Sequence, residues 1–211
     1  MNERKVLLIG DNGGDVWHPL DPIRRQLADI VGDLAPFVVT EDYDSLKKLT
    51  NDEYDAVISY TDCWRKEVTP EQTAGLLAFV AGGGGLLALH NGISLQSSYE
   101  LAQMVGGKFV SHPPYQPLSY HGTNPSHPLL HGVEDFTMNE EPYVIELDPF
   151  APVNIFLEYQ YEGRRYPAGW ERRYGLGKVV YLQPGHDARS FAPESYRQLI
   201  RNSLAWVANG A

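Results

Sequence analysis

The chain has 211 residues, of which 43% are hydrophobic and 21% charged, a composition typical of a globular protein. This length is enough to bury a substantial core, so we expect one domain over residues 1–211. Its formal net charge of -10 argues against nucleic-acid partners, because phosphate binding depends on clustered Lys and Arg side chains. The single cysteine, Cys63, excludes an internal disulfide, and no apolar run reaches membrane-spanning length, so we expect a cytoplasmic protein with no membrane partner.

The N-terminal half of the chain alternates short apolar runs with amphipathic segments. The elements expected there are a strand at 5–10, a helix opened by Pro19 or Pro22 that runs to Val31, a strand at 37–39, a short helical stretch around Leu46 and Leu49, a strand at 56–59, a helix that starts at Thr69-Pro70-Glu71 and ends at glycines 82–85, and a strand at 86–89. This rhythm indicates right-handed βαβ crossovers. It predicts an α/β fold with a doubly wound, mostly parallel sheet and helices on both faces.

The C-terminal half departs from this rhythm. After a helix at 99–105, residues 108–173 are rich in Pro, Gly and aromatic residues and contain strand-like runs, including 143–147 and 154–161. We expect these runs to be antiparallel or extended additions to the sheet. The apolar run at 178–182 returns to the central sheet, and a helix at 195–207 closes the chain.

Polar residues follow three of the predicted parallel strands at their carboxyl ends. Ligands bind beyond this edge in open parallel sheets, so we expect a polar cleft there. The residues delivered to it by the first, fourth and last strands are Trp17, His18, His90, Asn91, His186 and Asp187.

The turn after the fourth strand resembles a nucleophile elbow, because a buried strand is followed at once by His90-Asn91-Gly92 and then a helix. Class I glutamine amidotransferases place a cysteine at this point. Imidazole cannot replace a thiolate in forming a stable thioester, and Cys63 follows the third strand, where we expect a half-buried loop thiol. We therefore predict that the protein has no glutaminase activity.

The chain also resembles the ThuA (trehalose utilisation) family, a branch of the class I glutamine amidotransferase-like, flavodoxin-like folds that is associated with sugar metabolism. The matching stretches are 83–90, 127–133, 140–143, 167–170, 174–181, 185–187 and 204–206. The resemblance implies that His90 is the family's elbow histidine and that His186 stands where amidotransferases keep their catalytic histidine. It also implies roles for His18, for Glu141 and for Tyr143; Glu140 stands where the family usually has Asp.

The candidate residues allow two kinds of chemistry. His18, His90 and His186, with a carboxylate such as Glu141, suit a divalent metal such as zinc. Without metal, His90, His186 and Glu141 could instead act as catalytic acids and bases. The residues expected to bind the substrate are His18, Trp17, Asn91, His112, Tyr143, Trp170 and Asp187.

Structural roles compete with these assignments. For His112, a place in the cleft and packing within its loop are equally supported, whereas His121, His127 and His131 are interpreted as structural. Trp17, Trp64 and Trp170 suit either stacking on a sugar ring or core packing.

We expect a sugar-acting hydrolase, lyase or isomerase with a small-molecule, sugar-like ligand. The alternative is a non-catalytic pseudo-amidotransferase module that binds a ligand or a partner protein. The oligomeric state, a homo-oligomer included, is left open.

Overall fold

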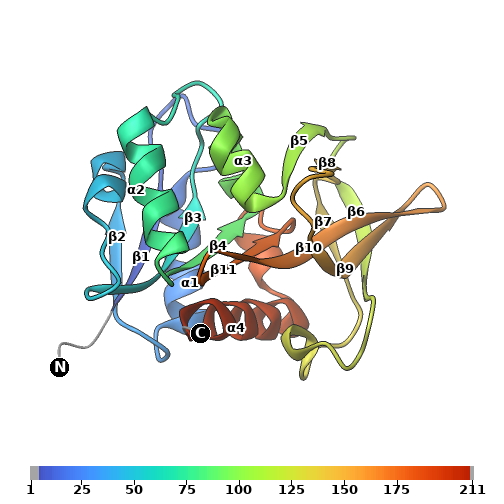
Figure 1. Ribbon diagram of the computed structural model, residues 1–211. Coiled ribbons are helices and arrows are strands. Elements are labelled where there is room, and N and C mark those ends of the chain that lie inside the picture. Colours follow the sequence, from blue (N-terminus) through green and yellow to red (C-terminus); the bar gives the residue numbers. More distant parts are fainter. Residues whose placement is uncertain (1–4, 210–211) are drawn as a thin grey trace.

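The fold is built around one large sheet, seen in a computed structural model that describes residues 5–209 (Figure 1). Residues 1–4 and 210–211 of the predicted domain lie outside the described part. The strands are β1 (Lys5–Gly10), β2 (Phe37–Thr40), β3 (Tyr54–Tyr60), β4 (Gly85–Leu89), β5 (Gly107–Ser111), β6 (Gln116–Gly122), β7 (Phe136–Glu140), β8 (Val144–Leu147), β9 (Asn154–Tyr161), β10 (Arg164–Tyr174) and β11 (Gly177–Leu182).

Nine of these strands form the large sheet in the order β2-β1-β3-β4-β11-β10-β9-β6-β7. The five strands from β2 to β11 are parallel, and the pairs from β11 to β7 are antiparallel. Every residue of β4 and β11 is buried, as their continuous apolar runs predict for strands covered on both faces. The expectation of a mixed α/β protein with a mostly parallel core and added antiparallel strands is confirmed.

The antiparallel part has a feature that the sequence did not indicate. The predicted strand-like run at 154–161 is β9 of the large sheet, whereas the run at 143–147 supplies β8, which pairs only with β5 in a separate two-stranded sheet. β6, β7, β9 and part of β10 extend beyond the helices, to the right in Figure 1. β5 and β8 lie above them in the same view, beside the carboxyl ends of the parallel strands.

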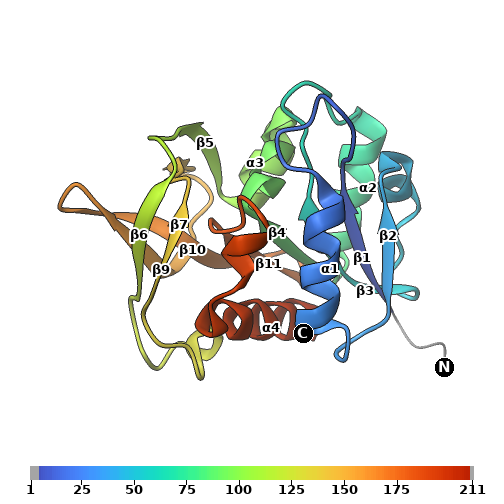
Figure 2. The ribbon, with the colours of Figure 1, turned by 180° about the vertical axis from the view of Figure 1, so that it is seen from behind.

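Two pairs of helices cover opposite faces of the parallel strands. The helices are α1 (Leu20–Val31), α2 (Pro70–Ala81), α3 (Tyr99–Val105) and α4 (Glu194–Ala208), and the short 3₁₀ helices are η1 (Tyr43–Lys48), η2 (His90–Ser97), η3 (Pro128–Leu130) and η4 (Ala188–Phe191). α1 and α4 share one apolar cluster with the sheet, and α2 and α3 share the other. The views from opposite sides in Figures 1 and 2 show the two layers.

Local sequence explains where the helices begin. Thr69 and Gln72 form a reciprocal capping box at the start of α2, and Pro70 occupies its first turn, where a missing N–H costs nothing. Ser98 caps α3 through its hydroxyl, which accepts the backbone N–H of Leu101. No helix within residues 5–209 combines the length and apolar character needed to cross a bilayer.

Candidate functional site

The elbow after β4 places His90 at the base of the site. His90 adopts a positive φ of 42°, a conformation that it shares only with Glu162 among the described non-glycine residues. Such strain in a non-glycine residue is concentrated at functional sites. A Cβ on Gly92 would lie 2.3 Å from the Ser59 carbonyl oxygen, so only glycine lets the chain turn back this closely against β3. His90 is thereby held fully buried directly above the sheet.

His18 comes from the loop between β1 and α1 and is held by Asp62, which follows β3. One Asp62 oxygen, Oδ2, accepts the backbone N–H groups of Trp17 and His18, both at 2.9 Å. The same oxygen lies 3.3 Å from His18 Nδ1. A carboxylate only accepts hydrogen bonds, so Nδ1 carries the proton and Nε2 is the free ring nitrogen.

His90 is oriented in the same manner by the end of β11. Its Nδ1 lies 2.7 Å from the carbonyl oxygen of Gln183 and must therefore donate to it. This bond leaves His90 Nε2 as the nitrogen that faces the site. His186 follows in the same loop, three residues beyond Gln183, and turns Nδ1 toward the site.

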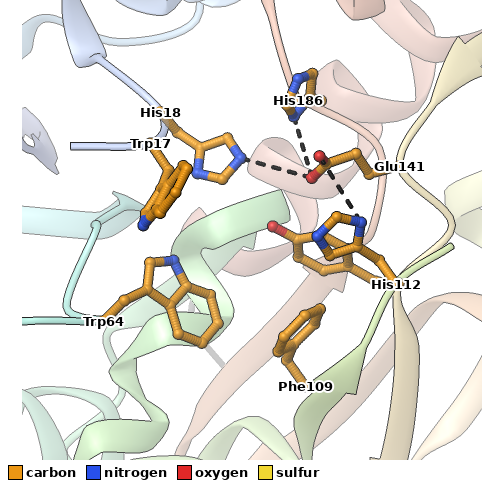
Figure 3. A pocket seen from close by; sticks show the side chains of 8 residues that line it. Trp17, His18, Trp64, Phe109, His112, Glu141 and His186 are labelled. Carbon is orange, nitrogen blue, oxygen red and sulfur yellow. Dashed lines mark ion pairs between the residues drawn. The ribbon is translucent and has the colours of Figure 1, made fainter. Parts of the chain in front are cut away.

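Glu141 is the point on which the three imidazoles converge. Its Oε2 lies 3.2 Å from His186 Nδ1, 3.7 Å from His90 Nε2 and 3.9 Å from His18 Nε2. One ligand atom from each of these four residues lies within 4.8 Å of all the others. The three ring nitrogens are buried and have no hydrogen-bond partner among the described residues. Figure 3 shows His18 and His186 approaching Glu141 from different sides.

The spacing of these atoms approaches that of a tetrahedral metal site. Ligand atoms about 2.0–2.1 Å from a zinc ion at tetrahedral angles are about 3.3–3.4 Å apart. The three separations from Glu141, from 3.2 to 3.9 Å, are close to this value or slightly wider. All four ligand atoms lie within 4.8 Å of one another, so the side chains would have to draw closer together to complete a four-ligand shell.

Burial and the acidic neighbours set the protonation of the site. Burial lowers the pKa of His90, and the nearby carboxylates only partly offset this, which favours the neutral ring that a metal requires. For His18, burial also disfavours the charged ring, but its contacts with Asp62 and Glu141 outweigh burial and raise its pKa. Burial opposes ionisation of Glu141, yet the three imidazoles outweigh it and hold its pKa far below the usual value.

The cluster opens into a cavity of about 210 Å³. Three of the four clustered residues reach its wall, whereas His90 lies behind them and against the Tyr143 ring, with ring centroids 4.1 Å apart. The cavity is lined by Trp17, His18, Trp64, Phe109, His112, Glu141, Tyr143 and His186. Figure 3 shows Trp17, Trp64 and Phe109 on one side of the cavity and His186, Glu141 and His112 across from them.

His112 also lines this cavity, but it lies outside the four-residue cluster. Its Nδ1 lies 3.8 Å from Glu141 Oε1. The other three histidines approach the second oxygen, Oε2. Its side chain is 40% exposed, so it lies nearer the mouth than His18 or His90. His112 combines both expected features, because it lines the cavity while its Nδ1 also lies 3.0 Å from the Pro113 carbonyl oxygen of its own loop.

Three residues expected to bind the substrate do not line this cavity. Trp170 is fully buried in β10, where its indole N–H donates to the Val105 carbonyl oxygen and its ring packs on Tyr181. Asn91 is also fully buried, and its amide donates to the Thr61 carbonyl oxygen. Asp187 caps η4 and pairs with Arg189.

The three histidines interpreted as structural lie outside the cluster. His121 pairs with Asp135 at 2.7 Å. His127 caps η3 and stacks on Phe156. His131 is exposed at the end of η3.

Sequence reasoning assigned no site role to several residues that shape the site, namely Asp62, Phe109, Gln183 and the fully buried Glu140. Asp62 and Gln183 each follow a buried strand at the carboxyl edge, which is the same signal that identified His90 and His186. Phe109 gave no such signal, because it belongs to the small β5–β8 sheet.

Comparison with known proteins gives a family match and a fold match. A family model described as ThuA, trehalose utilisation, matches residues 18–207. The structure of a ThuA-like protein from Parabacteroides merdae is 16% identical, with a TM-score of 0.81 over 99% of this chain and 91% of that chain. For a ThuA-like protein from Bacteroides uniformis the identity is 18% and the TM-score 0.76, over 97% of this chain and 91% of that chain.

A larger enzyme contains a similar fold as one of its parts. A β-galactosidase from Bacillus circulans is 17% identical, with a TM-score of 0.65 over 96% of this chain but only 31% of that chain. At such identities these structures demonstrate the fold alone. No curated protein matches the sequence.

Proposed function

The chain belongs to the ThuA family, and we propose that it is a metal-dependent enzyme of sugar metabolism whose divalent ion is held by His18, His90, His186 and Glu141. The observation that carries this proposal is the convergence on one carboxylate oxygen of three buried ring nitrogens that form no hydrogen bond within residues 5–209. Buried polar atoms in proteins almost always have a partner, so three such atoms at one point favour a missing ligand over a purely structural arrangement.

The donor set and its surroundings support zinc or a similar ion. Neutral imidazoles with one carboxylate suit zinc, and catalytic sites leave a position for water or substrate. Metal-bound histidines usually donate their other ring N–H to a carboxylate or carbonyl, as His18 does to Asp62 and His90 does to Gln183. Such an ion polarises a carbonyl group or lowers the pKa of a bound water.

The cavity wall supports a small, uncharged ligand. Its volume of about 210 Å³ is below the roughly 300–1,000 Å³ of drug-sized ligand sites, which favours a ligand of about one ring. The rings of Trp17, Trp64 and Phe109 offer surfaces on which the apolar CH face of a sugar can pack. No Lys or Arg is among the described residues that line the cavity, which favours a neutral sugar or keto-sugar over a phosphorylated one.

The chain's own groups would position and protonate such a ligand. Burial raises the pKa of Tyr143 well above its usual value, so its hydroxyl remains a hydrogen-bond donor at neutral pH. His112 reaches the cavity beside Glu141 and is placed to contact ligand oxygens near the mouth. Whether the reaction is hydrolysis, elimination or isomerisation depends on the ligand that these groups accept.

The test compares metal content, melting temperature and binding of a keto-sugar panel in the wild type, in His90→Ala and in the control His131→Ala. We expect stoichiometric metal in the wild type and the control, and its loss in His90→Ala without unfolding, because the buried β4 packs without the His90 ring. A wild type that binds sugars but no metal would favour metal-free acid and base catalysis. Binding without turnover of any tested sugar would favour the non-catalytic module.

A further inference from the structure

Glu140, the last residue of β7, is a buried acid for which the proposed chemistry gives no role. Its side chain is fully buried, yet within residues 5–209 it forms no ion pair with a Lys, Arg or His. Burying a carboxylate is costly unless its oxygens are satisfied by hydrogen bonds. The bonds that satisfy Glu140 therefore indicate why an acid is tolerated at this position.

The Glu140 carboxylate is satisfied by backbone N–H groups from two separate segments. Its Oε2 accepts the N–H of Gly185 at 2.7 Å, and the N–H of His186 lies 3.2 Å from both oxygens. Its Oε1 accepts the N–H of Glu141 at 3.0 Å. One side chain thus joins the end of β7 to the loop after β11.

The backbone around Gly185 is shaped to receive this carboxylate. Gly185 has a φ of 140°, which favours glycine, and its N–H and that of His186 both donate to the Glu140 carboxylate. A Cβ at Gly185 would lie 3.0 Å from the Cβ of His90, so a side chain there would also press on the elbow. The loop can take this conformation only with glycine at position 185.

The two segments that Glu140 joins carry two of the four clustered side chains. Glu141 follows Glu140 directly, and His186 follows Gly185 directly. Their side chains approach most closely of all the pairs with Glu141, at 3.2 Å. Because Glu140 accepts from both backbones, it fixes the separation of the Glu141 carboxylate and the His186 imidazole, which would have to bind the same ion.

We propose that Glu140 is a positioning residue that holds Glu141 and His186 at the separation required for metal coordination. This inference rests on the proposed metal site. Partners that orient metal ligands typically change metal affinity about 10–100-fold when they are altered. Glu140 acts through the backbone of two ligands and does not itself contact the ion.

The test uses Glu140→Gln, which keeps the size of the side chain but turns an N–H₂ donor toward backbone N–H groups. We expect Co²⁺ affinity to fall about 10–100-fold, with an altered Co²⁺ absorption spectrum that reports changed ligand geometry. The control is Asn202→Ala, because Asn202 also joins remote backbone, at Leu129 and His131, but touches none of the four clustered residues. Asn202→Ala should lower the melting temperature and leave Co²⁺ affinity and spectrum unchanged.

The outcomes separate this inference from the proposed function. A wild type that binds neither Co²⁺ nor Zn²⁺ refutes the metal site and with it the role of Glu140. Metal binding by the wild type with the same affinity and spectrum in Glu140→Gln refutes the role of Glu140 alone. If Glu140→Gln does not fold, Glu140→Asp is used instead, because it retains the charge but shortens the side chain. A smaller loss of Co²⁺ affinity is expected for Glu140→Asp. Unchanged Co²⁺ affinity in that variant overturns the inference.

Discussion

Asp62→Asn tests whether the partner of His18 contributes to metal binding. Three donors converge on Asp62 Oδ2, namely the backbone N–H groups of Trp17 and His18 and the His18 ring N–H. An asparagine oxygen can still accept from these groups, but it carries no charge. The substitution therefore removes the negative charge that fixes the His18 ring and makes its Nε2 more basic.

The expected losses of metal affinity and of folding stability are similar in size and are measured separately. Loss of such a partner typically weakens metal binding 10–100-fold, or about 1.4–2.8 kcal/mol. A hydrogen bond to a charged group contributes about 1.5–3 kcal/mol to folding stability, and a bond between neutral groups about 0.5–1.5 kcal/mol. Replacing the charged acceptor of these three bonds by a neutral one should therefore cost about 1–3 kcal/mol of stability in the metal-free protein. Zinc competition titrations and urea unfolding in the presence of a chelator measure the two quantities separately.

Asp135→Asn is the matched control for this experiment. Asp135 also accepts from a histidine ring, that of His121 at 2.7 Å, and from a backbone N–H, that of Gly122 at 3.3 Å. The pair lies outside the four-residue cluster, and the Asp135 side chain is 64% exposed. Equal zinc affinity in Asp62→Asn and in the wild type would refute the reasoning, as would an equal loss in both aspartate variants.

Two further predictions concern the elbow and the only cysteine. Burial raises the pKa of the Cys63 thiol, which also donates to the Tyr43 hydroxyl. We therefore expect no glutamate release from glutamine and slow alkylation of the native protein at neutral pH. Glutaminase activity that disappears in Cys63→Ala would contradict this expectation. Gly92→Ala places a methyl group 2.3 Å from the Ser59 carbonyl oxygen and should destabilise the fold by at least about 1–3 kcal/mol in urea unfolding. A wild-type unfolding midpoint in that variant would show that the elbow relaxes easily.

Much of the fold could be predicted from the sequence because its signals are local. The predicted strand at 5–10 and the helix at 99–105 coincide with β1 and α3, since buried runs and capping residues act over a few neighbours. The rule that ligands bind beyond the carboxyl ends of parallel strands was enough to bring His18, His90 and His186 to one edge. Neither inference required knowledge of side-chain contacts.

The tertiary structure alone decided which side chains meet. Trp170 and Trp17 are both aromatic residues near candidate motifs, but the register of β10 beside β11 buries Trp170 while Trp17 lines the cavity. Glu140 and Glu141 are adjacent acids, yet one accepts backbone N–H groups in the interior and the other faces three imidazoles. Side chains on successive residues of an extended chain point to opposite sides, and what lies on each side is supplied by segments remote in sequence. Sequence pattern thus determined the elements and the edge at which chemistry can occur, whereas long-range packing determined the partners of each group.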